Sequence, residues 1–168
     1  MNVELTNDIN NADMILIGMG EEAVSGIENV TLLEYMNKLA HVLEKHNYFI
    51  VATFDNEILR ASELNQKRIV YPYKSENDEY EGKQWDLYNR WLSATLAKKL
   101  LIIEAGEGFV NPNVIRWPFE RITMINNTAS FMRIHSELAQ IPAEIQNKAK
   151  SINKNAFEFL KEWLNDCE

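Results

Sequence analysis

Ile15-Leu16-Ile17-Gly18-Met19-Gly20 is an apolar run that ends in two closely spaced glycines. A second run of this kind, Leu101-Ile102-Ile103-Glu104-Ala105-Gly106-Glu107-Gly108, follows much later in the chain. Continuous apolar runs are typical of strands that are buried on both faces of a parallel sheet. Glycines directly after such strands permit tight turns and let a ligand approach the backbone. The two runs therefore predict a shared crevice at one edge of a sheet, of the kind that binds nucleotides.

The rest of the chain alternates between strand-like and helix-like stretches. Strands are predicted at 13–18, 48–53, 68–71, 100–104 and 130–134, with 130–134 as the final strand. Helices are predicted at 31–46, 56–63 and 85–97, from Trp117-Pro118-Phe119 onward, and near the end of the chain around Ala156, Phe157, Leu160, Trp163 and Leu164. The polar, acidic segment 75–82 is interpreted as a loop.

Strands that are separated by helices of this length are joined by right-handed crossovers, which produce a parallel sheet with helices on both faces. The predicted fold is a three-layer Rossmann-like α/β sandwich. At 168 residues, 46% of them hydrophobic, the chain is long enough for one core and short for two, so residues 1–168 are expected to form a single domain.

The composition excludes several classes of function. A net charge of −8 disfavours nucleic-acid binding, because an acidic surface repels phosphate backbones. The first residues do not resemble a signal peptide and no apolar run is long enough to span a membrane, so we expect a cytoplasmic protein without membrane contact. Cys167 is the single cysteine, which excludes an intramolecular disulfide and a multi-cysteine zinc site.

The block Gly18-Met19-Gly20-Glu21-Glu22-Ala23, read on to Ser25-Gly26-Ile27, resembles the glycine-rich NAD-binding loop of the sirtuins, which are NAD-dependent protein deacylases and ADP-ribosyltransferases. Val51-Ala52-Thr53-Phe54-Asp55 lies where a sirtuin carries its Thr-Gln-Asn-x-Asp motif. Residues 104–112 and 115–120 are similar to the late strand and loop of short bacterial sirtuin-like proteins. Arg133-Ile134-His135 falls where the family has the Ile-Asn that meets the adenosine end of NAD.

The sequence also departs from the sirtuin pattern. The position of the catalytic histidine is predicted to hold Tyr73, and tyrosine, with an ordinary pKa of about 10, is a poor base at neutral pH. Thr53 replaces the asparagine that contacts the ribose. Glu22 replaces the serine of the glycine loop and would repel a pyrophosphate. The cysteines of the sirtuin zinc module are missing, so no zinc is expected.

The preferred interpretation is a degenerate sirtuin-like domain, a pseudoenzyme that binds NAD or a related adenine nucleotide and lacks protein deacylase activity. The resemblance assigns Gly18, Gly20 and Ser25 to the phosphates and Thr53 and Asp55 to the nicotinamide ribose. It assigns close backbone contact to Gly106 and Gly108 and the adenosine side to His135. Asp55 is the candidate catalytic residue, and no metal ligand is predicted.

Two alternatives stay open. One is a ligand-free interaction or regulatory module that binds a protein partner or a second copy of itself. The other is an NAD-consuming glycohydrolase or ADP-ribosyltransferase in which Asp55 or Glu104 polarises the ribose. Asp55, Glu104 and Glu107 could also converge near the strand ends, where such acids bind ribose hydroxyls or act as a base, as in a nucleosidase. The other interpretation of Glu107 is a solvated or loop-capping acid. Arg116 is expected either to meet a phosphate or to pair with one of the surplus acids.

Overall fold

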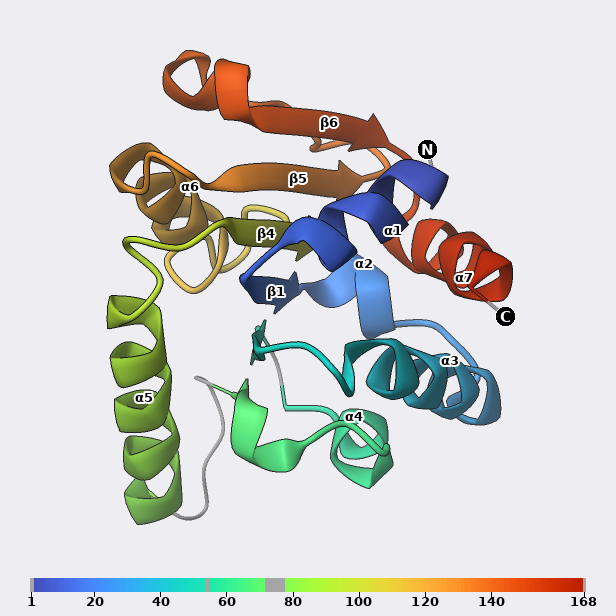
Figure 1. Ribbon diagram of the computed structural model, residues 1–168. Coiled ribbons are helices and arrows are strands. Elements are labelled where there is room, and N and C mark those ends of the chain that lie inside the picture. Colours follow the sequence, from blue (N-terminus) through green and yellow to red (C-terminus); the bar gives the residue numbers. More distant parts are fainter. Residues whose placement is uncertain (1, 54, 72–77, 168) are drawn as a thin grey trace.

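A six-stranded parallel sheet forms the centre of the molecule (Figure 1). The computed structural model describes residues 2–53, 55–71 and 78–167. The strands are β1 (Met14–Met19), β2 (Tyr48–Ala52), β3 (Ile69–Val70), β4 (Leu100–Ala105), β5 (Ser130–His135) and β6 (Ala149–Asn153). Their order is β3-β2-β1-β4-β5-β6, so the direction of winding reverses between β1 and β4. This reversal is the topological switch point of a Rossmann-like fold.

Helices cover both faces of the sheet, which confirms the predicted three-layer architecture (Figure 1). One face carries α1 (Asn2–Asn11), α3 (Asn29–Leu43) and α7 (Ala156–Asp166). The other face carries α5 (Asp78–Ser93) and α6 (Arg116–Ile125). The short elements are α2 (Glu21–Val24), α4 (Glu57–Ala61) and the 3-10 turns η1 (Gln66–Arg68) and η2 (Ala143–Lys148).

The alternation of side chains along β1 explains why its run is apolar throughout. Ile15 and Ile17 point into the core under α1, α3 and α7, whereas Leu16 points into the core under α5 and α6. All three residues are buried. Full burial of each such side chain contributes about 1.5–3 kcal/mol, so the strand is fixed in the centre of the sheet.

The local sequence also explains how helix α7 begins and which of its faces is buried. The Asn155 side chain accepts a hydrogen bond from the Glu158 N–H and so caps the first turn. The apolar face of the helix is buried, and the Trp163 indole donates to the Thr6 hydroxyl of α1 at 3.0 Å. This contact joins the two ends of the chain over one face of the sheet.

Several predictions about the elements were wrong. The strand at 130–134 is not the last, because β6 follows it at the edge of the sheet. Residues 78–82 of the segment interpreted as a loop belong to α5, and residues 75–77 lie outside the described residues. The predicted helix at 85–97 is too long, because α5 ends at Ser93 and Leu96 is 60% exposed. The predicted helix start at 117–119 is confirmed by α6.

Candidate functional site

The two glycine turns meet at the carboxyl edge of the sheet, at the switch point between β1 and β4. The Gly20 N–H donates to the Ala105 carbonyl at 2.8 Å, and the Glu22 N–H donates to the Gly106 carbonyl at 3.2 Å. Gly106 has a φ of +75°, which residues with a side chain rarely adopt. The turns are therefore joined backbone to backbone, at the place where open α/β sheets bind ligands.

Gly18 and Gly20 are required by packing within the protein. A Cβ on Gly18 would lie 2.5 Å from Ile115 Cγ2, so this glycine admits the start of α6 against the sheet. A Cβ on Gly20 would lie 2.5 Å from the Glu107 backbone nitrogen, so this glycine admits the second turn. Neither glycine is among the residues that line the cleft above the turns.

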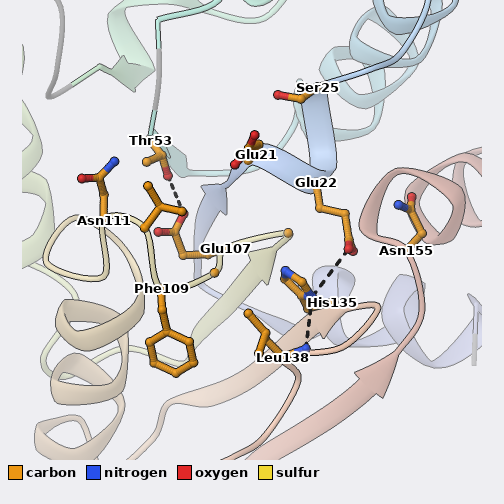
Figure 2. A pocket seen from close by; sticks show the side chains of 13 residues that line it. Glu21, Glu22, Ser25, Thr53, Glu107, Phe109, Asn111, His135, Leu138 and Asn155 are labelled. Carbon is orange, nitrogen blue, oxygen red and sulfur yellow. Dashed lines mark hydrogen bonds and ion pairs between the residues drawn. The ribbon is translucent and has the colours of Figure 1, made fainter.

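This cleft has a volume of about 410 Å³ and is walled by segments that follow four of the strands and by α2 (Figure 2). The predicted site residues Ser25, Thr53, Gly106, Gly108 and His135 all line it. The other lining residues are Glu21, Glu22, Glu107, Phe109, Val110, Asn111, Leu138 and Asn155. The two apolar runs thus bring together residues that are far apart in the sequence.

Glu22 is held at one end of the cleft by donors from two other segments. Its carboxylate accepts from the Ser136 N–H at 2.9 Å and from the Ala156 N–H at 2.8 Å, and also from the Ser136 hydroxyl. Ala156 is the first residue of α7, where unpaired backbone N–H groups favour negative charge. The Glu22 carboxylate, which the sequence predicts to lie beside a pyrophosphate, is therefore already hydrogen-bonded to donors of the protein.

His135 lies beside Glu22 (Figure 2). Its Nδ1 accepts from the Glu137 N–H and the Leu138 N–H, both at 3.1 Å. A ring nitrogen that accepts hydrogen bonds carries no proton, so the hydrogen-bond pattern assigns the proton of the neutral imidazole to Nε2. A Glu22 carboxylate oxygen also lies 3.5 Å from Nδ1. Nε2 faces the turn at Gly108 and offers the cleft an N–H donor.

Glu107 lies at the other end, beside Thr53 (Figure 2). It is only 3% exposed, and its Oε2 accepts from the Thr53 hydroxyl at 2.5 Å. Burial raises the pKa of Glu107 to about 7, while the Thr53 hydrogen bond lowers this pKa and the nearby Glu104 raises it. Of the two interpretations of Glu107, the solvated or loop-capping acid was wrong, because the turn after β4 folds this side chain inward against Thr53.

A buried ion cluster supports the cleft from beneath. Arg133 donates to both carboxylate oxygens of Glu104, at 2.7 and 3.0 Å, and to Glu120 at 2.7 Å. Arg116 lies 3.7 Å from Glu104 and donates to the Glu107 carbonyl at 3.2 Å. Glu104 is completely buried and therefore cannot reach a ligand. Of the two roles open to Arg116, the structure shows pairing with protein groups.

Asp55 and Tyr73 were predicted to lie near the nicotinamide side. Asp55 pairs with Arg60 and is not among the lining residues, although Thr53 of the same predicted motif is. Tyr73 lies outside the described residues. The motif therefore contributes a hydroxyl to the cleft, and the carboxylate at this end comes from the turn after β4 instead.

The sequence analysis did not assign Asn155 and Asn111 to the site, and it left the role of Glu107 open. Asn155 lies just after β6 and lines the cleft. Because this edge strand was not predicted, the position of Asn155 was not predicted either. Asn111 lies in an irregular loop that carries no periodic signal. Glu107 has the clearest signal, because it stands between Gly106 and Gly108 directly after a buried strand.

Within residues 2–53, 55–71 and 78–167, no group of three or more His, Cys, Asp or Glu side chains is arranged to hold a metal ion. No helix in that same part of the chain is long and apolar enough to cross a membrane.

No family model matches this chain. Among curated proteins, a protein ADP-ribosyltransferase of Staphylococcus aureus (strain Mu50) is 32% identical over 65 residues, or 39% of this chain. The match spans only 21% of the length of that protein.

Solved structures match over nearly the whole chain. A solved structure described as the structural basis for sirtuin substrate affinity superposes with a TM-score of 0.65 at 10% identity. The superposition covers 99% of this chain and 98% of that structure's chain. A Sir2 protein bound to an acetylated peptide gives 0.65 at 11% identity, with the same coverage of 99% and 98%. A Sir2 complex with a p53 peptide and NAD+ gives 0.61 at 9% identity and covers 98% and 97%.

The strand order and the cleft define a Rossmann-like α/β domain with its crevice at the switch point. Within this class, the superpositions show that the chain has a sirtuin-like fold.

Proposed function

We propose that the cleft binds NAD or a related adenine nucleotide. The observation that carries this proposal is the junction of the β1 and β4 turns at the switch point, beneath a cleft of about 410 Å³. Open α/β sheets bind ligands at this position, and small-molecule pockets have volumes of about 300–1,000 Å³. A Sir2 complex with the same fold contains NAD+, which supports the same ligand class.

The polar groups of the cleft suit the two halves of a dinucleotide. The Thr53 hydroxyl, beside Glu107, offers a hydrogen bond to ribose hydroxyls at one end. His135 Nε2–H and Asn155 offer hydrogen bonds to the adenosine half at the other end. The Ser25 hydroxyl on the α2 wall is a donor for the phosphates.

The charge of the cleft predicts weak binding. No lysine or arginine occurs among the described lining residues, so neutral donors have to bind the pyrophosphate. We expect a dissociation constant on the order of 0.1 mM, about −5.5 kcal/mol of binding free energy. Because no lining cation pairs with the phosphates, the affinity is expected to change little with salt concentration.

We also propose that the domain lacks protein deacylase activity. This part rests on the sequence, which places Tyr73 where the family has its histidine base. Incubation with NAD and an acetyl-lysine peptide is expected to give no deacetylated peptide by mass spectrometry. Deacetylation that requires NAD would contradict the proposal.

Calorimetry with NAD, ADP-ribose and AMP tests the binding proposal. The obstructing variant is Gly108→Trp. A Cβ at this position meets nothing closer than Leu138 Cδ1 at 3.5 Å, and Gly108 lines the cleft, so the indole is expected to occupy it. This variant is expected to stay folded and to lose the heat of binding. The exposed Glu137, outside the cleft, supplies the control Glu137→Gln, which is expected to bind like the wild type. The absence of heat and of any thermal shift at millimolar ligand would refute a nucleotide role.

A further inference from the structure

We infer that Glu107 is the proton acceptor of a hydrolytic site that cleaves the N-glycosidic bond between nicotinamide and ribose. The inference rests on the proposed function, because it requires NAD in this cleft. The Glu107 carboxyl group lines the cleft and receives the Thr53 hydroxyl on Oε2, while no described residue donates to Oε1. The protein thus positions one carboxyl oxygen and leaves the other for water.

The other acids at this edge of the sheet are less suited to the role. Glu104 is completely buried in the ion cluster beneath the cleft. Asp55 pairs with a neighbouring arginine outside the cleft. Glu22 is held by donors from two other segments, and Glu21 is exposed to solvent. Among the acids that the structure describes, Glu107 alone combines a position in the cleft with burial and a single donor.

The surroundings of Glu107 allow it to gain and lose a proton at neutral pH. The charged groups that act on Glu107 are Glu104 on β4, Arg133 on β5 and Arg116 on α6, and Glu21 and Glu22 on α2 line the same cleft. Burial raises the pKa of Glu107 to about 7, Glu104 adds to this effect, and the two arginines oppose it. A general base is most effective when its pKa lies near the working pH.

In the proposed reaction, Glu107 accepts a proton from water while the water oxygen bonds to the anomeric carbon of the ribose. The carbon–nitrogen bond to nicotinamide breaks, and its electron pair stays on the ring nitrogen, which becomes neutral. Glu107 then releases its proton to solvent. The products are nicotinamide and ADP-ribose. The carboxylate also stabilises the positive charge that develops on the ribose before the new bond is complete.

The test compares wild type, Glu107→Gln and Glu137→Gln with NAD, and chromatography follows nicotinamide and ADP-ribose. Loss of a general base costs about 10²–10⁴-fold in rate, so Glu107→Gln is expected to release nicotinamide at least about 100-fold more slowly. Its affinity for ADP-ribose, measured by calorimetry, is expected to stay within about threefold of wild type. Glu137→Gln is expected to match wild type in both measurements.

Thr53→Val adds a readout that a purely structural role would not move. The wild-type rate is expected to rise with pH and to level off above about 7, where Glu107 has lost its proton. Because the Thr53 hydrogen bond lowers the pKa of Glu107, its removal is expected to shift this inflection to higher pH. An unchanged inflection would overturn the inference, and this result decides the question even if Glu107→Gln fails to fold.

The remaining outcomes separate the two proposals. Nicotinamide release that Glu107→Gln leaves unchanged would overturn the role of Glu107. Binding of NAD by the wild type without any release would overturn the inference and leave the proposed function intact. The absence of NAD binding would refute both.

Discussion

The two ends of the cleft each carry a glutamate, and the two carboxyl groups have opposite surroundings. Glu22 accepts from two backbone N–H groups and a hydroxyl, on the segments that begin at Ser136 and Ala156. Glu107 accepts from the Thr53 hydroxyl and is buried, which raises its pKa to about 7. The environment of each carboxyl group, rather than the residue type, therefore gives Glu22 its structural hydrogen bonds and raises the pKa of Glu107.

The two carboxyl groups are therefore expected to have different roles in the cleft. Glu22 ties α2 to the segments after β5 and β6 and so fixes the wall that carries His135. Glu107 contributes little to holding segments together, because its carboxyl group binds one hydroxyl. Substitution at the first end is therefore expected to change stability, and substitution at the second to change pH dependence and turnover.

The largest expected effect comes from breaking the junction that supports both ends. Gly106→Ala forces a side chain onto a residue with a φ of +75° and places its Cβ 2.5 Å from the Ala23 nitrogen. We expect a loss of about 3–4 kcal/mol in the free energy of unfolding, measured with urea. Gly108→Ala is the matched control, because its Cβ meets only ordinary contacts, and is expected to change stability by less than about 1 kcal/mol. Equal losses of unfolding free energy in the two variants would contradict the close contact between the two glycine turns.

The second prediction sharpens the Glu107 end. A carboxyl group whose pKa rises from 4.5 to about 7 on folding contributes stability that is complete below 4.5 and is lost as pH rises through about 7. At about 1.4 kcal/mol per pH unit, the full contribution is about 3 kcal/mol. The fall in unfolding free energy between about pH 5 and 8 is expected to be smaller in Glu107→Gln than in wild type or Glu137→Gln. Parallel pH curves would mean that Glu107 has an ordinary pKa.

The third prediction sharpens the Glu22 end. Glu22→Ala leaves the Ser136 and Ala156 N–H groups without their acceptor. We expect the free energy of unfolding to fall by about 1–3 kcal/mol, as measured by urea denaturation. Glu21→Ala, at an adjacent exposed position, is expected to change it by less than about 0.5 kcal/mol. A Glu22→Ala protein as stable as wild type would show that these hydrogen bonds do not hold the wall.

The smallest effect is expected just outside the cleft. Asp55→Ala removes a carboxylate that pairs with Arg60 and does not line the cleft. Calorimetry is expected to give an NAD affinity within about twofold of wild type, less than about 0.4 kcal/mol. A tenfold loss of NAD affinity would show that Asp55 belongs to the site, as the sequence predicts.

The central strands and the glycine turns could be predicted because their signals are local. A buried parallel strand has to be apolar throughout, and the turn after it needs glycine where backbones touch. The edge strand β6 was missed because only Ile152 of its five residues is buried, so its sequence is polar. Helix α1 was missed for a similar reason, since Leu5 and Ile9 are its buried residues.

Side-chain direction in the site could not be predicted, because it depends on tertiary contacts. Spacing placed Thr53 and Asp55 in one motif, but only Thr53 lines the cleft. The burial of Glu107 depends on how the turn after β4 folds against β2, which no local pattern specifies. The hydrogen bonds to Glu22 come from segments more than a hundred residues away, so its structural role was also hidden in the sequence.

A crystal structure of the protein with NAD tests the central claim most directly. The account predicts density for the dinucleotide in the cleft, with the nicotinamide ribose beside Thr53 and Glu107 and the adenosine beside His135 and Asn155. An empty cleft in crystals equilibrated with millimolar NAD, or NAD bound at another surface, would contradict it.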